Sequence, residues 1–202
     1  MGIIRAIIAF IMEIMETVVF VGSLFIVVYL FILQPNQIKG ASMEPTFYNG
    51  NYIFTSKITY KIRQPRRGDV VVFHSPKNHD IEFIKRVIGL SGDTILIENN
   101  EIYINGVLIP EKYISAKTTL VPGSFAQEGV PIQVPNGQIF VMGDNRPRSS
   151  DSREFGTIPK DLIVGQVFYR YFPANKIGPI NNPYDDRGNL RAYSLLILGA
   201  RS

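Results

Sequence analysis

The sequence has no cysteine and only two histidines, His74 and His79, among its 202 residues. The absence of cysteine excludes disulfide frameworks, thiol proteases and cysteine-ligated zinc sites. Two histidines leave almost nothing from which to build a histidine triad or a metal cluster, and we assign them no role. Charged residues are also sparse, at 19%, and the net charge of +4 is well short of a nucleic-acid-binding signature. Because apolar residues make up 46% of the chain, a folded protein is expected.

Many of these apolar residues are crowded near the N-terminus. Residues 17–33 carry no charge at all. A helix needs about 20 mostly apolar residues to span a bilayer. Residues 12–33 meet this requirement if Glu13 and Glu16 lie at the level of the lipid headgroups. We therefore expect a transmembrane helix over 12–33, preceded by a short cytoplasmic or interfacial segment over 1–11.

Two other interpretations of the apolar run are less consistent with the sequence. A cleavable signal peptide has a core of about 7–15 residues and a small-residue cleavage site, but this run is longer and residues 34–42 offer no such site. A buried core helix of this length is hard to accommodate in a chain of 202 residues. Arg5 on one side and Lys39 on the other give only a slight charge bias, so the sequence does not settle the orientation.

After Gln34-Pro35 the sequence predicts one all-β domain over residues 34–177. Asn105-Gly106 is a strong hairpin turn, because both residues tolerate positive φ. Residues 115–137 are expected to form a long loop or loose insertion, and residues 178–202 a mobile C-terminal tail. The predicted strands are Asn51–Thr55, Val70–Phe73, Ile81–Ile88, Thr94–Glu98, Ile102–Ile104, Gln138–Met142 and Gln166–Tyr171.

One lysine lies where a strand is expected to bury apolar side chains. Alternation along the strand places Lys85 on the same face as Ile81, Phe83 and Val87, with Glu82 and Arg86 on the opposite face. Burial penalises the ammonium form and so lowers a lysine pKa, which makes the neutral amine available as a base. The alternative is a lysine that extends to solvent from a strand near the sheet edge.

Ser42 is the candidate nucleophile for such a base. It follows Gly40-Ala41, directly after the predicted anchor. Small preceding residues let a substrate backbone approach, and a nearby backbone N–H can polarise a carbonyl. The alternative is an ordinary turn that joins the helix to the first strand.

A third stretch, residues 143–156, is unusually rich in charged and hydrogen-bonding side chains. The spacing of its oxygen ligands does not fit a calcium loop. Asp144, Asp151, Arg146 and Arg153 are candidates for a buried ion-pair network that fixes the loop. The alternative is a solvated surface loop.

Together these segments resemble bacterial type I signal peptidase, because four sequence boxes follow an anchor in the order found in that family. The resemblance covers residues 15–170 approximately, and the order makes it specific. The boxes are Ser42-Met43-Glu44-Pro45-Thr46, Gly68-Asp69-Val70-Val71-Val72-Phe73, Lys85-Arg86-Val87-Ile88-Gly89-Leu90-Ser91-Gly92-Asp93, and Gly143-Asp144-Asn145-Arg146 with Ser149 and Asp151-Ser152-Arg153.

The resemblance implies a fold and a set of roles. The fold is mainly β, a signal-peptidase/LexA-like all-β catalytic domain tethered to one N-terminal transmembrane helix. Ser42 corresponds to the nucleophile and Lys85 to the general base. Ser149 matches the serine that orients the lysine amine, and Asp151 and Arg146 match the charged residues that support this arrangement.

The same resemblance implies how substrate is held, with two departures from the family pattern. The oxyanion hole would use the backbone N–H of Ser42. Family members often add a serine hydroxyl at the position where this chain has Gly40. The backbone N–H of Gly40 could replace that hydroxyl as a hydrogen-bond donor. Ser91 stands where the family usually has proline. Met43 and Ile84 match residues near the pockets for small side chains, although Ile84 needs a bulge to face Lys85.

A membrane-bound serine endopeptidase is the function that the resemblance implies. It would remove N-terminal signal peptides from exported precursors, cutting after small residues at positions −1 and −3. Its partners would be those precursors and membrane lipids, with no nucleic acid, metal or cofactor. The catalytic domain would lie on the extracytoplasmic side of a cell membrane, or of a thylakoid membrane in a cyanobacterium or plastid.

Two alternatives remain open at the level of the sequence. One is a self-cleaving relative with the same dyad, similar to LexA-type repressors, but the chain has an anchor and lacks a DNA-binding helical domain. The other is a non-catalytic, membrane-anchored β domain that binds partners or lipid.

Overall fold

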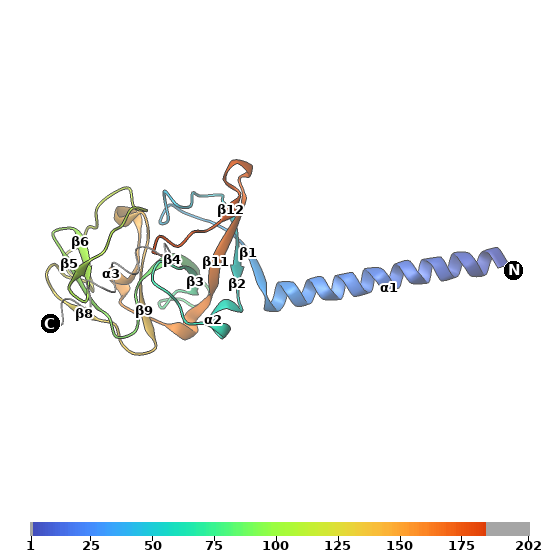
Figure 1. Cartoon of the computed structure of the whole chain (residues 1–202), viewed down its shortest axis with the longest axis horizontal. Coiled ribbons are helices and arrows are strands. Elements are labelled where there is room, and N and C mark those ends of the chain that lie inside the picture. Colours follow the sequence, from blue (N-terminus) through green and yellow to red (C-terminus); the bar gives the residue numbers. More distant parts are fainter. Residues whose placement is uncertain (1, 185–202) are drawn as a thin grey trace.

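The computed structural model describes residues 2–184 and consists of a long N-terminal helix leading into a β domain (Figure 1). Helix α1 spans Gly2–Phe31. Its stretch Gly2–Tyr29 is long and apolar enough to cross a membrane, and the most apolar 18-residue part of it has a mean hydropathy of 2.2 and is not buried in the protein. The helix therefore begins at Gly2 and includes most of the segment expected to precede it, and it ends at Phe31 rather than at residue 33.

The β domain contains two sheets within the described residues. The strand order of the larger sheet is β1-β2-β11-β3-β4-β9-β10, with β12 paired to β11, and that of the smaller sheet is β7-β6-β5-β8. The strands of the larger sheet are β1 (Leu33–Gln37), β2 (Tyr52–Ser56), β3 (Val70–His74), β4 (Glu82–Gly89), β9 (Gln138–Met142), β10 (Ile158–Pro159), β11 (Ile163–Phe172) and β12 (Gly178–Pro179). Those of the smaller sheet are β5 (Thr94–Glu98), β6 (Glu101–Ile104), β7 (Val107–Leu108) and β8 (Ile132–Gln133).

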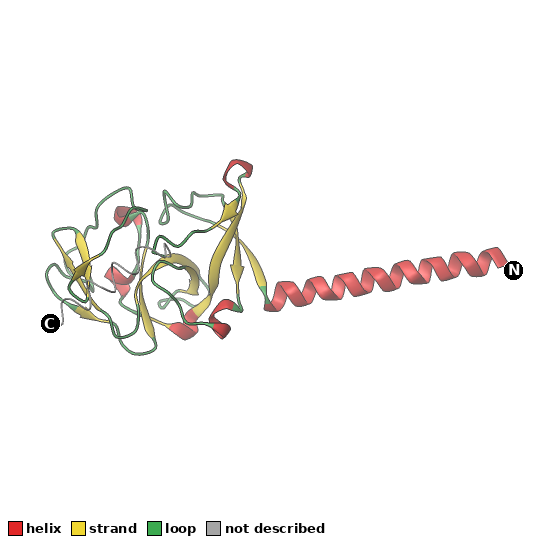
Figure 2. Ribbon diagram, in the orientation of Figure 1, coloured by secondary structure: helices red, strands yellow, loops and turns green. Residues whose placement is uncertain are grey.

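Helical structure in the β domain is confined to short turns at the connections (Figure 2). Two of these are single α-helical turns and three are 3₁₀ turns. They are α2 (Thr59–Ile62), α3 (Ser152–Phe155) and the 3₁₀ turns Arg146–Arg148, Lys160–Leu162 and Ala174–Lys176.

Strand β4 lies inside the larger sheet, paired antiparallel with β3 on one side and β9 on the other. The alternation of faces is present, and both faces are covered, so Arg86 is buried (2% exposed) as well as Lys85 (4% exposed). Only Glu82, at the start of the strand, is exposed.

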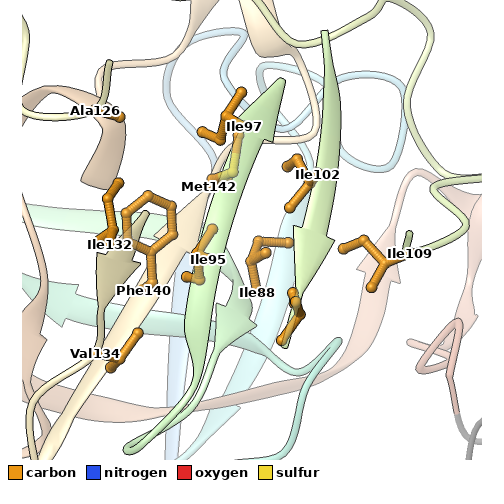
Figure 3. Packing of buried hydrophobic residues seen from close by; sticks show 11 residues of the cluster. Ile88, Ile95, Ile97, Ile102, Ile109, Ala126, Ile132, Val134, Phe140 and Met142 are labelled. Atoms are coloured by element: carbon orange, nitrogen blue, oxygen red, sulfur yellow. The ribbon is translucent and has the colours of Figure 1, made fainter. Parts of the chain in front are cut away.

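Buried apolar side chains form three clusters, one of which joins the two sheets. The largest joins the smaller sheet to β4 and β9 and is rich in isoleucine (Figure 3). Branched side chains suit strands, because they pack well on a pleated surface. The residues of this cluster are Ile88, Ile95, Ile97, Ile102, Ile104, Ile109, Ala126, Ile132, Val134, Phe140 and Met142.

Each predicted strand overlaps an observed one, and Asn105-Gly106 turns the chain between β6 and β7 with positive φ at both residues. Strand β1 was not predicted, because Pro35 interrupts its pattern. Proline is tolerated there because β1 is an edge strand, which leaves one side of its backbone without a strand partner.

The chain beyond residue 178 departs from the expected mobile tail. Strand β12 pairs with β11, the side chain of Asn182 bonds the carbonyl of Arg67, and Tyr184 is buried. Residues 178–184 therefore belong to the domain. The remainder of the expected tail, 185–202, lies outside the described residues.

Candidate active site

Ser42 is held at the end of the segment that follows β1. The chain turns at Gly40, which has φ +93°, a conformation that favours glycine. The loop after β9 then fixes the position of Ser42 through Asn145. The Asn145 N–H donates to the Ser42 carbonyl at 3.0 Å, and its side-chain amide donates to the Ala41 carbonyl at 3.0 Å.

Lys85 reaches this serine from β4. Its Nζ donates to Ser42 Oγ and to the carbonyl of Ile84, each at 2.9 Å. Burial lowers the pKa of Lys85 from 10.5 to about 8, because the ammonium loses its hydration, while the carboxylates of Asp151 and Asp144 raise it and limit the shift. A measurable fraction of the amine is therefore neutral near pH 7–8, beside a serine hydroxyl.

Buried ion pairs surround the pair, as expected for residues 143–156, but the partners differ from the expected ones. Asp151 pairs with Arg153 at 2.8 Å, within the predicted set. Asp144 instead pairs with Arg86 at 2.6 Å, and Arg146 pairs with Glu111. The sequence-based network missed Arg86 and Glu111, because each lies far from the loop in sequence.

These ion pairs fix the backbone of the loop at Gly143. The Gly143 N–H donates to the Asp151 carboxylate at 3.0 Å, and the Gly143 carbonyl accepts from Arg146 Nε at 3.1 Å. The Arg153 guanidinium also donates to the Arg146 carbonyl at 2.7 Å. Asp151 and Arg146 thus act on the loop that holds Ser42, and neither side chain bonds Lys85 in the described structure.

Ser149 does not make the hydrogen bond to Lys85 that the resemblance implies. Its Oγ is buried and has no hydrogen-bond partner among the described residues. It nevertheless lies beside the site, because a Cβ built on Gly143 would stand 2.2 Å from Ser149 Oγ and 2.4 Å from the Ser42 carbonyl oxygen. A buried hydroxyl without a hydrogen-bond partner costs free energy, so forming a hydrogen bond to this group is favourable.

Two backbone N–H groups near Ser42 are candidate oxyanion donors, and only one of them is without a hydrogen-bond partner in the described structure. Within residues 2–184 the Ser42 N–H donates to no protein group. The Gly40 N–H, expected as a substitute oxyanion donor, instead donates to the side-chain oxygen of Asn49 at 3.0 Å. That expectation is therefore not met in this structure, and Asn49 was not identified from the sequence.

A groove of about 640 Å³ runs past the Ser42–Lys85 pair. Ile84 lines it although no bulge occurs there, since the pairing of β4 with β3 is unbroken and the irregularity with β9 lies between Val87 and Gly89. Met43 does not line it. At 1% exposure, Met43 packs in the core with residues that form part of the groove wall. The lining comprises residues 35–42, Ile53, Val72, Glu82, Phe83, Ile84, Lys85, Arg148 and Ser150.

Comparison with known proteins places this geometry in a family. The profile described as "Signal peptidase, peptidase S26" matches residues 11–172. The chain belongs to that family. The predicted recognition, the mainly β fold with an apolar N-terminal helix, and the assignment as a serine peptidase anchored to a membrane are therefore confirmed.

Individual members of the signal peptidase family are similar over most of the chain. A probable signal peptidase I-2 of Synechocystis is 36% identical and covers 83% of this chain and 76% of its own. Signal peptidase IB of Staphylococcus aureus strain COL is 35% identical and covers 85% and 96%. A crystal structure of a signal peptidase I from Enterococcus faecalis is 36% identical, with a TM-score of 0.44, covering 52% of this chain and 97% of that one.

In the part of the chain that the structure describes, no three His, Asp or Glu side chains gather closely enough to hold a metal. His74 Nδ1, at the end of β3, lies 2.8 Å from the His79 carbonyl oxygen.

Proposed function

We propose that this chain removes N-terminal signal peptides from exported precursor proteins through a Ser42–Lys85 dyad. The observation that carries the proposal is the 2.9 Å separation of Lys85 Nζ from Ser42 Oγ, with the lysine pKa lowered by burial to about 8. The curated relatives are named signal peptidases, which supplies the substrate class.

The first chemical step uses the neutral amine of Lys85. It takes the proton of Ser42 Oγ as the oxygen attacks the scissile carbonyl. The carbonyl oxygen becomes an oxyanion, which the free N–H of Ser42 stabilises. The protonated lysine then gives its proton to the leaving amine, and an acyl ester remains on Ser42.

Deacylation reverses these roles. Lys85 removes a proton from a water molecule, which attacks the ester and releases the new carboxylate and the Ser42 hydroxyl. Asp151 and Arg146 support both steps by holding the loop at Gly143, and we assign Ser149 the role of a hydrogen-bond partner for the amine once substrate is bound. The groove wall at Ile84 favours small side chains at positions −1 and −3 of the precursor.

The membrane anchor confines the enzyme to the plane in which its substrate lies. Beside β1, which follows α1, strands β2 and β11 carry an aromatic cluster that includes Tyr52 and Phe172. Their rings lie edge to face with centroids 5.7 Å apart, and the two residues are 37% and 52% exposed. Aromatic side chains are suited to the headgroup region. We infer that this cluster contacts lipid and that the β domain lies on the extracytoplasmic side of the membrane.

Cleavage of a precursor tests the proposal. Wild type, Ser42→Ala and Lys85→Ala are reconstituted in lipid vesicles with a precursor that has alanine at −1 and −3. Wild type should release the signal peptide, and both variants should lose cleavage by at least about a thousandfold while retaining the wild-type circular dichroism spectrum. Full activity in either folded variant contradicts the dyad, and an inactive wild type that binds the precursor supports a non-catalytic β domain.

A further inference from the structure

At the end of the groove nearest α1, a carboxylate bridges the two walls. Glu82, the first residue of β4, accepts hydrogen bonds from Gln34 Nε2 at 3.3 and 3.4 Å and from Asn36 Nδ2 at 3.3 Å. The two amides belong to β1, which is separated from β4 by three strands in the sheet order. The curled sheet therefore brings its edge strand and an inner strand together across the groove.

One of the two amides is held in a defined orientation. Asn36 Oδ1 accepts from Thr55 Oγ1 at 3.0 Å, and Thr55 is fully buried in β2. Because an ionised carboxylate can only accept, the contact with Glu82 identifies the amide nitrogen as the atom directed at Glu82, and the hydroxyl of Thr55 is then the donor to the amide oxygen. The bonds to Glu82 itself are long and exposed, so a substrate side chain can replace them at little cost.

The charge of Glu82 is not neutralised by a cation. Within residues 2–184 it forms no ion pair with lysine or arginine, and it is the one acidic residue among those that line the groove. Its cross-strand neighbour His74 engages the His79 carbonyl through Nδ1. The carboxylate is therefore available to a positively charged group in the groove.

The geometry sets where an extended substrate would meet this carboxylate. Glu82 precedes Lys85 by three residues, which is about 10 Å along a strand. Alternation places the two on opposite faces of β4, but both line the groove. The apolar part of a signal peptide enters from the membrane, and the Glu82 end of the groove is the one that adjoins the end of α1. With residue −1 of the precursor at Ser42, Glu82 then faces the precursor near residue −4.

We propose that Glu82 is a specificity-determining residue that selects precursors by the charge of the side chain near position −4. A basic side chain there exchanges for the Asn36 and Gln34 amides and is attracted, a neutral polar one is tolerated, and an acidic one is repelled. This inference rests on the proposed peptidase activity, and it adds a charge preference to the preference for small residues at −1 and −3.

The test uses soluble peptides that have alanine at −1 and −3. In each peptide one of the positions −4, −5 and −6 carries Lys, Gln or Glu. The kcat/KM values are measured at pH 8. Wild type should prefer Lys over Glu by roughly tenfold near −4, as expected for a partly screened charge pair. The preference should shrink in 1 M NaCl, because salt shortens the range of exposed charges.

Two Glu82 variants and one matched control decide the outcome. Glu82→Gln should reduce the Lys-to-Glu ratio to about two or less, and Glu82→Lys should invert it, as expected when an attractive charge pair becomes repulsive. Glu98→Gln, which removes the same charge from β5 outside the groove, should keep the wild-type ratio. An unchanged ratio in Glu82→Gln, an equal loss in Glu98→Gln, or a wild-type ratio of one at every position overturns the proposal.

These outcomes are separate from failure of the peptidase activity itself. If wild type does not cleave the neutral Gln peptide, or Ser42→Ala cleaves it equally, the proposed function fails. If the Gln peptide is cleaved in a Ser42-dependent manner but the charge ratio does not depend on Glu82, only the specificity proposal fails. Where Glu82→Lys does not fold, the isosteric Glu82→Gln variant gives the decision.

Discussion

Lys85 Nζ lies 2.9 Å from Ser42 Oγ, although the two residues are 43 positions apart in the chain. The contact joins an inner strand of the larger sheet to the segment that leaves its edge strand. Asn145 holds the serine from the other side by bonding the carbonyls of Ala41 and Ser42. Three separate segments therefore fix the geometry of the pair, and the buried position of Lys85 makes its amine a usable base.

Replacing Lys85 by methionine should stabilise the protein at pH 7. The folded-state pKa is lowered from 10.5 to about 8, so the native state disfavours the proton that the unfolded state binds. Removing the amine relieves this cost and loses two hydrogen bonds, which leaves a net gain of about 1–2 kcal/mol in the free energy of unfolding.

The pH dependence supplies the control for Lys85→Met. Between about pH 8 and 10.5 the native state binds fewer protons at residue 85 than the unfolded state, so wild-type stability from this group rises with pH in that window. The gain in Lys85→Met, measured by urea denaturation, should shrink as the pH rises from 7 to 10. A gain that grows with pH contradicts the burial argument.

Replacing Gly143 by alanine should damage the site directly. Its Cβ would lie 2.4 Å from the Ser42 carbonyl oxygen and 2.2 Å from Ser149 Oγ, so the backbone around the nucleophile must shift. We expect a loss of at least about a hundredfold in kcat/KM. Gly22→Ala, in helix α1 with nothing within 4 Å, should keep wild-type activity.

Ser149→Ala separates a catalytic from a structural role for this serine. Its Oγ is buried without a partner, so removing it should leave the free energy of unfolding unchanged or slightly higher. If the hydroxyl binds the Lys85 amine when substrate is present, kcat/KM falls by roughly tenfold to a thousandfold at the same time. Unchanged kinetics would remove Ser149 from the mechanism.

Asp144→Ala should be among the most destabilising single changes in the loop. It leaves the Arg86 guanidinium, 2% exposed, without the carboxylate that accepts from both Nε and Nη2, at a cost of about 3–5 kcal/mol. The exposed pair of Lys77 and Glu154 provides the comparison. Glu154→Ala should change the free energy of unfolding by about 1 kcal/mol or less in the same urea titration.

Local pattern was sufficient to predict much of the fold. The long uncharged run predicts α1, and alternating apolar residues predict the strands, because both periods follow from backbone geometry. Helix α1 begins before the predicted membrane span, at Gly2, and β1 was missed because of Pro35. The two-residue period of a strand also made Lys85 recognisable in the sequence as a lysine on an apolar strand face.

The partners inside the site could not be predicted from local pattern. Arg86 pairs with Asp144 across 58 positions, and Arg146 donates to Glu111 across 35. Such pairings are decided by how the sheets fold over one another. The hydrogen bond from the Gly40 N–H to the Asn49 side chain and the burial of Met43 follow from the same tertiary packing.

The pH dependence of kcat/KM reports the protonation of the base in the free enzyme. For a peptide without ionisable groups, kcat/KM should rise in proportion to the neutral amine and level off above a pKa of about 8, the value to which burial lowers the pKa of Lys85. A profile that is flat between pH 6 and 10, or one that rises only near the ordinary lysine pKa of about 10.5, would show that the buried amine of Lys85 is not the base.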